Sequence, residues 1–232
     1  KEELIMKYER MTRGRFISRP NRFIANVEIN GVTEVCHVKN TGRCRELLIP
    51  GVSTVFLQKS DNPDRKTKFS VIGVLKGDRK INMDSQVTNK VVHEWILKGN
   101  LFKDVTLIKP EKTYKNSRFD FYIETKNEKA FVEVKGVTLE EDGIVRFPDA
   151  PTERGVKHIY ELCECIKDGY QAYIIFVIQM KDVLYFTPND ITHKEFGDAL
   201  RAAEKKGVKI IAVDCDVTED SIDICDYVDI IL

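Results

Sequence analysis

Asp120, Glu133 and Lys135 are residues whose types and spacing could carry out hydrolytic chemistry. Residues i and i+2 of a β-strand share a face, so Glu133 and Lys135 point the same way if residues 130–137 form a strand. Two carboxylates that face each other suit a hard divalent cation, Mg²⁺ or Mn²⁺, which prefers oxygen ligands and bridges to phosphates. A lysine beside them can orient or help deprotonate the attacking water, and can steady negative charge at phosphorus. The three residues predict metal-dependent phosphodiester hydrolysis, with Asp120 and Glu133 as the metal ligands.

A hairpin would bring the two acids together. The short polar segment 125–128 separates strands predicted over 119–123 and 130–137. A turn centred between Lys126 and Asn127 makes Asp120 and Glu133 direct cross-strand neighbours, with Cβ atoms about 4.5–5.5 Å apart. In the first strand, the apolar residues 119, 121 and 123 are expected on one face and Asp120 on the other. Like charges placed opposite each other destabilise a sheet unless a proton, a lysine or a cation offsets them.

The tripeptide (Asp/Glu)-x-Lys is common in this chain and carries little information alone. It occurs five times, beginning at residues 64, 78, 124, 133 and 204. Only the copy at Glu133 lies in an apolar predicted strand that follows an Asp-bearing strand in register. An exposed ladder of salt bridges is the alternative interpretation of the acid pair.

Two predicted helices could add to the set. Glu94 flanks the apolar stripe of a helix predicted over 89–101 and would supply a third carboxylate; a solvated helix charge is the alternative. Arg154 and Lys157 lie one turn apart in a helix predicted over 152–167, where their donors could hold a scissile phosphate. The alternative there is an amphipathic helix in which Lys157 pairs with Glu161 at i,i+4. The candidate catalytic residues are Asp120, Glu133, Lys135, Glu94, Arg154 and Lys157.

The first third of the chain is typical of a small barrel. Five or six short strands alternate with turns over residues 10–84, and Asn30-Gly31 between apolar runs predicts a two-residue hairpin. An OB-like barrel that binds nucleic acid fits this pattern, and an SH3-like or other barrel without a ligand is the alternative. Basic residues would hold the backbone, and two phenylalanines would stack on bases. The predicted nucleic-acid contacts are Arg13, Arg15, Phe16, Arg19, Arg22, Phe23, Lys39, Arg43 and Arg45.

The pattern changes after Asp84. Helical periodicity alternates with β-branched runs, including a nearly continuous apolar run over 170–180 that suits a strand buried on both faces. This alternation predicts an α/β domain with a mixed sheet. The expected organisation is an OB-like barrel over 1–84 and an α/β domain over 85–232.

Charge and composition limit the classes further. The 232 residues have no net charge, but residues 1–84 hold 17 Lys and Arg against 10 Asp and Glu, so the remainder is acidic. A basic first third suits a polyanion such as DNA, although an ordinary solvated surface is the alternative. No apolar run approaches the roughly 20 residues that span a bilayer, and the chain starts with no secretory signal, so we expect a cytoplasmic protein without membrane contact. The six cysteines have no zinc-ligand spacing and are expected to be reduced thiols.

Six motifs occur in an order that closely resembles the sugar fermentation stimulation protein A (SfsA) family, over about residues 10 to 213. They are Asn-Arg-Phe at 21–23, His-Val at 37–38 with Asn-Thr-Gly-Arg at 40–43, Ser-Arg-Phe-Asp-Phe at 117–121, Val-Glu-Val-Lys-Gly-Val-Thr-Leu at 132–139, Phe-Pro-Asp-Ala at 147–150 and Thr-Glu-Arg-Gly at 152–155 with Lys-His at 157–158. Lys39 stands where the family carries proline.

The resemblance implies an OB-like domain followed by a PD-(D/E)xK restriction-endonuclease-like α/β domain. Asp120 then matches the first acid of the nuclease motif, and Glu133 and Lys135 match its second acid and its lysine. It further implies sequence-independent binding of DNA or RNA and a nuclease that uses Mg²⁺ or Mn²⁺. The alternative is a non-catalytic DNA-binding regulator linked to sugar metabolism that retains the nuclease scaffold. The oligomeric state stays open, a homo-oligomer included.

Overall fold

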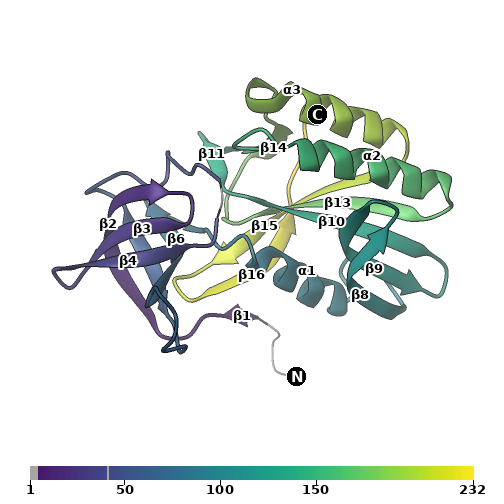
Figure 1. Ribbon diagram of the computed structural model, residues 1–232. Helices are drawn as coiled ribbons and strands as arrows, with labels where there is room; N and C mark the ends of the chain where they lie inside the picture. The colour runs from purple at the N-terminus through teal and green to yellow at the C-terminus, as the bar shows by residue number, and fades with distance from the viewer. Residues whose placement is uncertain (1–4, 41) are drawn as a thin grey trace.

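A closed β-barrel forms the N-terminal part of the computed structural model, which describes residues 5–40 and 42–232 (Figure 1). Thr41, in the motif at 40–43, lies outside the described residues, as do residues 1–4 of the predicted first domain. The barrel strands are β2 (Met11–Asn21), β3 (Ile24–Ile29), β4 (Val32–Val38), β5 (Thr54–Lys59) and β6 (Phe69–Lys76), with β7 (Arg79–Asn82) paired to β6. A parallel pairing of β4 with β6 closes the barrel, so the predicted barrel is confirmed.

Local sequence explains how the barrel turns and fills. Asn30 and Gly31 both have positive φ, 50° and 80°, and connect the paired residues Ile29 and Val32 as a two-residue hairpin. Successive side chains of a strand point to opposite faces, so every second side chain of a barrel strand points into the barrel. Phe16 is therefore 1% exposed and lies in the barrel core with Val27.

A seven-stranded mixed sheet is the main sheet of the second domain, and it includes a short strand from before the barrel. Its order is β1 (Met6–Lys7), β16 (Ser221–Tyr227), β15 (Lys209–Val217), β13 (Gln171–Ile178), β10 (Lys129–Val137), β9 (Ser117–Thr125) and β8 (Val105–Tyr114). The pairs β10–β13 and β13–β15 are parallel, whereas the other pairs are antiparallel. The predicted mixed α/β class is confirmed. Strands β1, β8 and β16 were not predicted.

Three helices cover the two faces of this sheet. Helix α1 (Val87–Leu97) packs on one face, whereas α2 (Glu153–Lys167) packs on the other and carries α3 (Asp190–Lys205) (Figure 1). Two apolar cores result. One core lies under α1 and includes Val132 and Val134, and the other extends from the barrel to α2 and includes Phe131. Alternate residues of β10 therefore face opposite helices.

The barrel and the sheet domain are joined by buried polar contacts. Gln179, at the end of β13, donates to the Asn82 side chain and to the Asp84 carbonyl, both at 3.0 Å. A small sheet of β11 (Leu139–Glu141), β12 (Ile144–Phe147) and β14 (Tyr185–Pro188) lies at the junction. Its Glu140 binds Lys76 and Arg79 of the barrel hairpin. These contacts place barrel residues within reach of the end of β10.

None of the helices in the described part of the chain combines the length and the apolar character that crossing a bilayer requires.

Candidate functional site

The β9–β10 hairpin has the predicted register. Thr125 donates to the Glu128 carbonyl at 2.9 Å, so the turn is centred between Lys126 and Asn127. Backbone pairing runs from Lys129–Glu124 to Val132–Phe121, which makes Glu133 and Asp120 the next opposed positions. The Val134 N–H, the next one of β10 to face β9, donates to the Asp120 side chain.

One detail of β9 differs from the sequence prediction. Phe121 and Ile123 lie in the core under α1, but Phe119 packs against Phe131 on the α2 side, with ring centroids 5.5 Å apart. The expectation that the three share a face is wrong, because β9 stops pairing with β10 after Phe121, although it stays paired with β8 as far as Ser117, and its side chains no longer alternate regularly.

Asp120 is held by neighbours on two elements. Its Oδ2 accepts a 2.7 Å hydrogen bond from the backbone N–H of Val134, and its Oδ1 accepts one of 2.7 Å from the Asn89 side chain of α1. Burial raises the pKa of Asp120, and the negative charge of Glu133 raises it further. The two carboxylates therefore interact, as their opposed positions require.

Glu133 is 3% exposed and uses only one of its two oxygens. Its Oε1 accepts from Lys135 Nζ at 2.5 Å and from His158 Nδ1 at 2.6 Å. Its Oε2 is buried and has no hydrogen-bond partner among the residues that the structure describes. Burial has the largest influence on the Glu133 pKa and raises it, but the hydrogen bond from His158 and the charge of Lys135 outweigh burial and lower it.

The first two turns of helix α2 carry His158, which contacts Glu133, and Arg154, which contacts His158. Thr152 caps the helix by accepting from the Gly155 N–H at 3.1 Å. Arg154 Nε donates to His158 Nε2 at 3.4 Å, which leaves the proton on Nδ1, where it faces Glu133. His158 therefore orients the Glu133 carboxylate, and Arg154 orients His158.

Both carboxylates line one cavity of about 540 Å³ between the barrel and the sheet domain, together with Asn89, Lys135 and Arg154 but without His158. Asp120, Glu133 and Lys135 lie along one wall, and Arg154 lies at the start of α2. The ionisable side chains that line it are Arg22, Asp120, Glu133, Lys135, Arg146, Asp149 and Arg154. The cavity combines acidic oxygens, which suit a cation, with four cationic groups, which suit an anion.

Two of the predicted catalytic residues do not line this cavity. Glu94 is 7% exposed on α1, where burial raises its pKa, and the charged groups that act on it most are Lys90, Asp223, Lys98 and His93. The structure thus does not support a third carboxylate at this site, because residue 89 and not residue 94 of α1 faces β9. Lys157 donates to the Asn116 carbonyl at 3.0 Å and lies 3.8 Å from Glu161, which matches the alternative interpretation of that helix.

Several predicted nucleic-acid contacts have structural partners. The predicted stacking role of Phe16 is wrong, because its ring is buried in the barrel. Lys39 forms a 2.8 Å ion pair with buried Asp84, so its charge is neutralised between the domains. Arg13 pairs with Glu219, Arg15 pairs with Glu28 at 2.8 Å, and Arg19 donates to the carbonyls of Arg22, Asn40, Gly42 and Arg43.

Four other predicted contacts remain at the surface. Arg22 lies over the Phe23 ring with its guanidinium carbon 4.8 Å from the ring centroid, and the ring is 45% exposed. Arg43 and Arg45 are exposed on the segment that follows β4. Their contacts with nucleic acid stay predictions, but Arg22 also lines the cavity.

Another group of potential metal ligands lies at the β15–β16 end of the sheet. Oxygen and sulfur atoms of Asp214, Cys225 and Asp226 lie within 4.8 Å of one another. The Lys181 ammonium already lies between the two carboxylates, 3.1 Å from Asp214 and 2.6 Å from Asp226. This group is therefore a salt-bridged cluster.

Sequence reasoning missed Asn89, Arg146 and the hydrogen bond from His158 to Glu133. His158 stands on the buried face of amphipathic α2, one turn after Arg154, which is a signal that could have placed it against the sheet. Asn89 and Arg146 carry no comparable signal, because an asparagine in a first helical turn and an arginine in a short strand are ordinary surface residues.

Comparison with known families agrees with this architecture. Residues 86–221 match the family model described as the sugar fermentation stimulation protein RE domain, and residues 17–83 match the SfsA N-terminal OB domain. Curated relatives are named sugar fermentation stimulation protein homolog. One from Clostridium beijerinckii is 74% identical over 98% of this chain and 100% of its own length, and one from Ruminiclostridium cellulolyticum is 68% identical over 94% and 96%.

A solved structure is similar over the whole fold. It is SfsA of Pyrococcus furiosus in complex with Ca²⁺, and it matches with a TM-score of 0.90 and 27% sequence identity. The match covers 98% of each chain, so it includes the barrel, the mixed sheet and the junction between them.

Proposed function

The chain belongs to the SfsA family, and we propose that it is a divalent-metal-dependent nuclease of the PD-(D/E)xK class that binds nucleic acid without reading its sequence. The observation that carries the proposal is the buried Glu133 Oε2, which has no partner among the described residues and lies beside Asp120 on one cavity wall. A buried carboxylate oxygen without a partner is costly, and a cation in the cavity could satisfy this one together with the second carboxylate, Asp120.

The donor set fits a hard divalent cation. Both Asp120 and Glu133 offer carboxylate oxygens, and the cavity is open enough to leave room for water and substrate. The P. furiosus relative is described in complex with Ca²⁺, a cation that takes the same kind of ligand. We therefore assign Mg²⁺ or Mn²⁺ to Asp120 and Glu133. When bound, the cation would supply positive charge for the phosphate oxygens during attack.

The protein's own groups position the substrate and the attacking water. Lys135 lines the cavity next to Glu133, where its ammonium can orient water and stabilise negative charge on the phosphate. Arg154 lies one helical turn from His158 and offers its remaining N–H donors to a non-bridging phosphate oxygen. His158 and Asn89 hold the two carboxylates in place from opposite helices. These fixed contacts mean that little reorganisation is needed when a phosphodiester enters.

A cleavage panel tests the proposal. Labelled single-stranded DNA, duplex DNA and RNA are incubated with purified protein and Mg²⁺, Mn²⁺ or EDTA. We expect cleavage with at least one metal and none in EDTA, and a loss of about a hundredfold or more in Asp120→Ala and Lys135→Ala. Glu94→Gln is the control for a nearby acid and should cleave as the wild type does.

Two outcomes would contradict the nuclease. Cleavage that survives Asp120→Ala would come from another site or another protein. Binding without any cleavage would favour the alternative, a non-catalytic DNA-binding regulator that retains the scaffold.

A further inference from the structure

The cavity has one wall from each domain. Arg22, Asn40 and Gly42 line it from the barrel, and Asp120 and Glu133 line it from the sheet domain. Its volume of about 540 Å³ is too small to enclose a B-form duplex, whose major groove alone is about 12 Å wide. Glu133 is 3% exposed, so the phosphate to be cleaved must enter this space and cannot be reached from outside.

Hydrogen bonds hold the barrel side of the cavity in place. The Arg19 guanidinium donates to the carbonyls of Asn40, Gly42 and Arg43 at 2.6–2.8 Å. The backbone N–H of Arg43 donates to Asp149 Oδ2 at 2.8 Å, which ties the barrel to the sheet domain. A Cβ on Gly42 would lie 2.5 Å from the same carboxylate oxygen, so the two domains meet here without space between them.

Arginines from three elements line the cavity. Arg22 lies in the β2–β3 turn, Arg146 in β12 and Arg154 in the first turn of α2. Arg146 lies 3.4 Å from Glu141, whose side chain is 65% exposed, so this pair is weak and open to exchange. Arg22 lies over the exposed ring of Phe23, a surface on which an unpaired base could stack.

We infer that this site accepts an unpaired strand and excludes an intact duplex, and that Arg22 and Arg146 hold the phosphates that flank the bond to be cleaved. The inference rests on the proposed nuclease and specifies its substrate class. A small cavity with a recessed acid pair fits one sugar-phosphate chain with its bases turned out, whereas a duplex must first unpair, which costs free energy. Arginines that reach the cavity from three different elements fit more than one phosphate of the bound strand.

Binding without metal separates this inference from catalysis. The affinities of full-length protein for a short fluorescent single-stranded DNA, the same sequence as blunt duplex, and the matching RNA are measured in EDTA by anisotropy. We expect either single strand to bind at least about tenfold more tightly than the duplex. Arg22→Ala and Arg146→Ala should each weaken single-strand binding about five- to tenfold.

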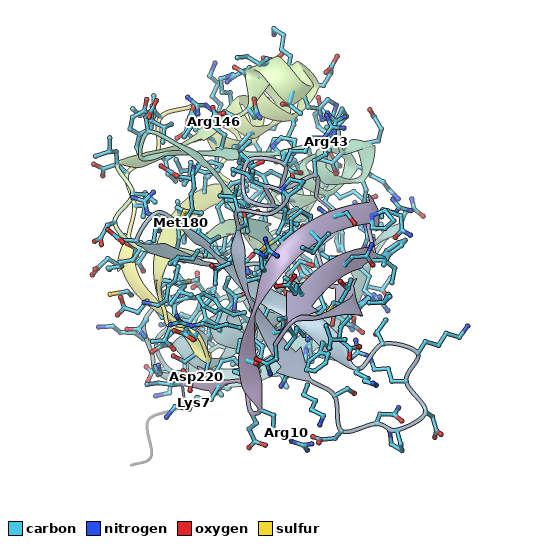
Figure 2. The ribbon with its side chains drawn as sticks, turned by 90° about the vertical axis from the view of Figure 1, so that its left-hand side faces the viewer. Lys7, Arg10, Arg43, Arg146, Met180 and Asp220 are labelled. Carbon is cyan, nitrogen blue, oxygen red and sulfur yellow. The ribbon has the colours of Figure 1, made fainter. Side chains whose placement is uncertain are left out.

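Arg10→Ala is the matched control. Arg10 is also a barrel arginine, paired with Asp61, but it lies at the end of the molecule opposite Arg43 and Arg146 (Figure 2). It should change affinity by less than about twofold. Thermal unfolding of each variant shows that the fold is kept.

The outcomes distinguish the two proposals. Equal affinity for duplex and single strand, no detectable binding of either, or an Arg10→Ala loss as large as that of Arg146→Ala would overturn the inference. With Mn²⁺ added, efficient cutting of blunt duplex would also overturn it while leaving the nuclease intact. Preferential, arginine-dependent binding with no cleavage of any strand would uphold the inference and refute the nuclease.

Discussion

Replacing Glu133 by glutamine should abolish the stabilisation that divalent cations give to the folded protein. The amide oxygen of glutamine can still accept from His158 and Lys135, so the hydrogen bonds around Oε1 are retained. An NH₂ group then replaces Oε2 and presents a donor where a cation needs an acceptor. Glu94→Gln makes the same chemical change at another buried carboxylate whose Oε2 also has no partner in the described residues, but which does not line the cavity.

The expected size of the effect follows from linkage. A cation at a hundredfold excess over its dissociation constant stabilises the fold by about 2.7 kcal/mol. For 232 residues, an unfolding entropy of about 2.1 cal/mol/K per residue converts this to a rise in Tm of about 5–6 °C. If Glu133→Gln weakens binding about a hundredfold, the same cation concentration gives about 0.4 kcal/mol, or about 1 °C.

In the absence of metal, Glu133→Gln should change the free energy of unfolding by less than it changes the stabilisation by the cation. Removing the charge of Glu133 relieves its repulsion with Asp120, about 3 kcal/mol for charges about 5 Å apart at an effective dielectric constant of 20. The two retained hydrogen bonds lose their charge assistance, which lowers each from about 1.5–3 to about 0.5–1.5 kcal/mol and acts in the opposite direction. The lowered pKa of Glu133 indicates that the favourable contacts dominate, so the variant in EDTA should be slightly less stable than the wild type.

Differential scanning calorimetry with Mn²⁺ and with EDTA measures both effects. Wild type and Glu94→Gln should show the full rise in Tm, and Glu133→Gln should show almost none. An undiminished rise in Glu133→Gln, or its loss in Glu94→Gln, would refute the assignment of the cation to the cavity.

Three other predictions concern the parts of the fold that hold the site. Glu140 has a lowered pKa because hydrogen bonds from its basic neighbours outweigh burial, so it stabilises the fold above its unfolded pKa of about 4.3 and loses this effect as pH falls. By urea unfolding, the free energy of unfolding of Glu140→Gln should be about 2 kcal/mol lower than that of the wild type at pH 7. This difference should shrink below about pH 4, and a difference that does not change with pH would contradict the charge effect. Phe16→Ala should lower the free energy of unfolding by about 3–5 kcal/mol in the same assay, because the Phe16 ring is buried. Phe23→Ala should change stability little but weaken single-strand binding, because the Phe23 ring is exposed; the reverse pattern would contradict these two positions. Lys39→Met should cost about 3 kcal/mol by leaving Asp84 unpaired, with Asp84→Asn in the same background restoring part of the loss; an unchanged midpoint would show that the pair contributes nothing.

The sequence predicts the acid pair well because its position depends on short-range rules. Alternation alone places Glu133 and Lys135 on one face, and a short polar turn sets the register with Asp120. The same local logic identifies the Asn30–Gly31 hairpin and the β-barrel. These features need only a strand period of two and turn chemistry.

The remaining features depend on contacts between distant segments. Nothing near Phe16 distinguishes an inward ring from a base-stacking one until the barrel closes. Strand β16 is acidic and alternates only through Ile222 and Ile224, so its place beside β15 becomes evident only when the sheet forms. The contact of His158 with Glu133 likewise needs the packing of α2 on β10.

The location of Mn²⁺ in a soaked crystal is the most direct measurement. Anomalous scattering should place one ion within ligand distance, about 2.0–2.5 Å, of Glu133 Oε2 and beside the Asp120 carboxylate. A signal only at Asp214 and Asp226, or none at a concentration that raises Tm, would contradict a cation site formed by Asp120 and Glu133.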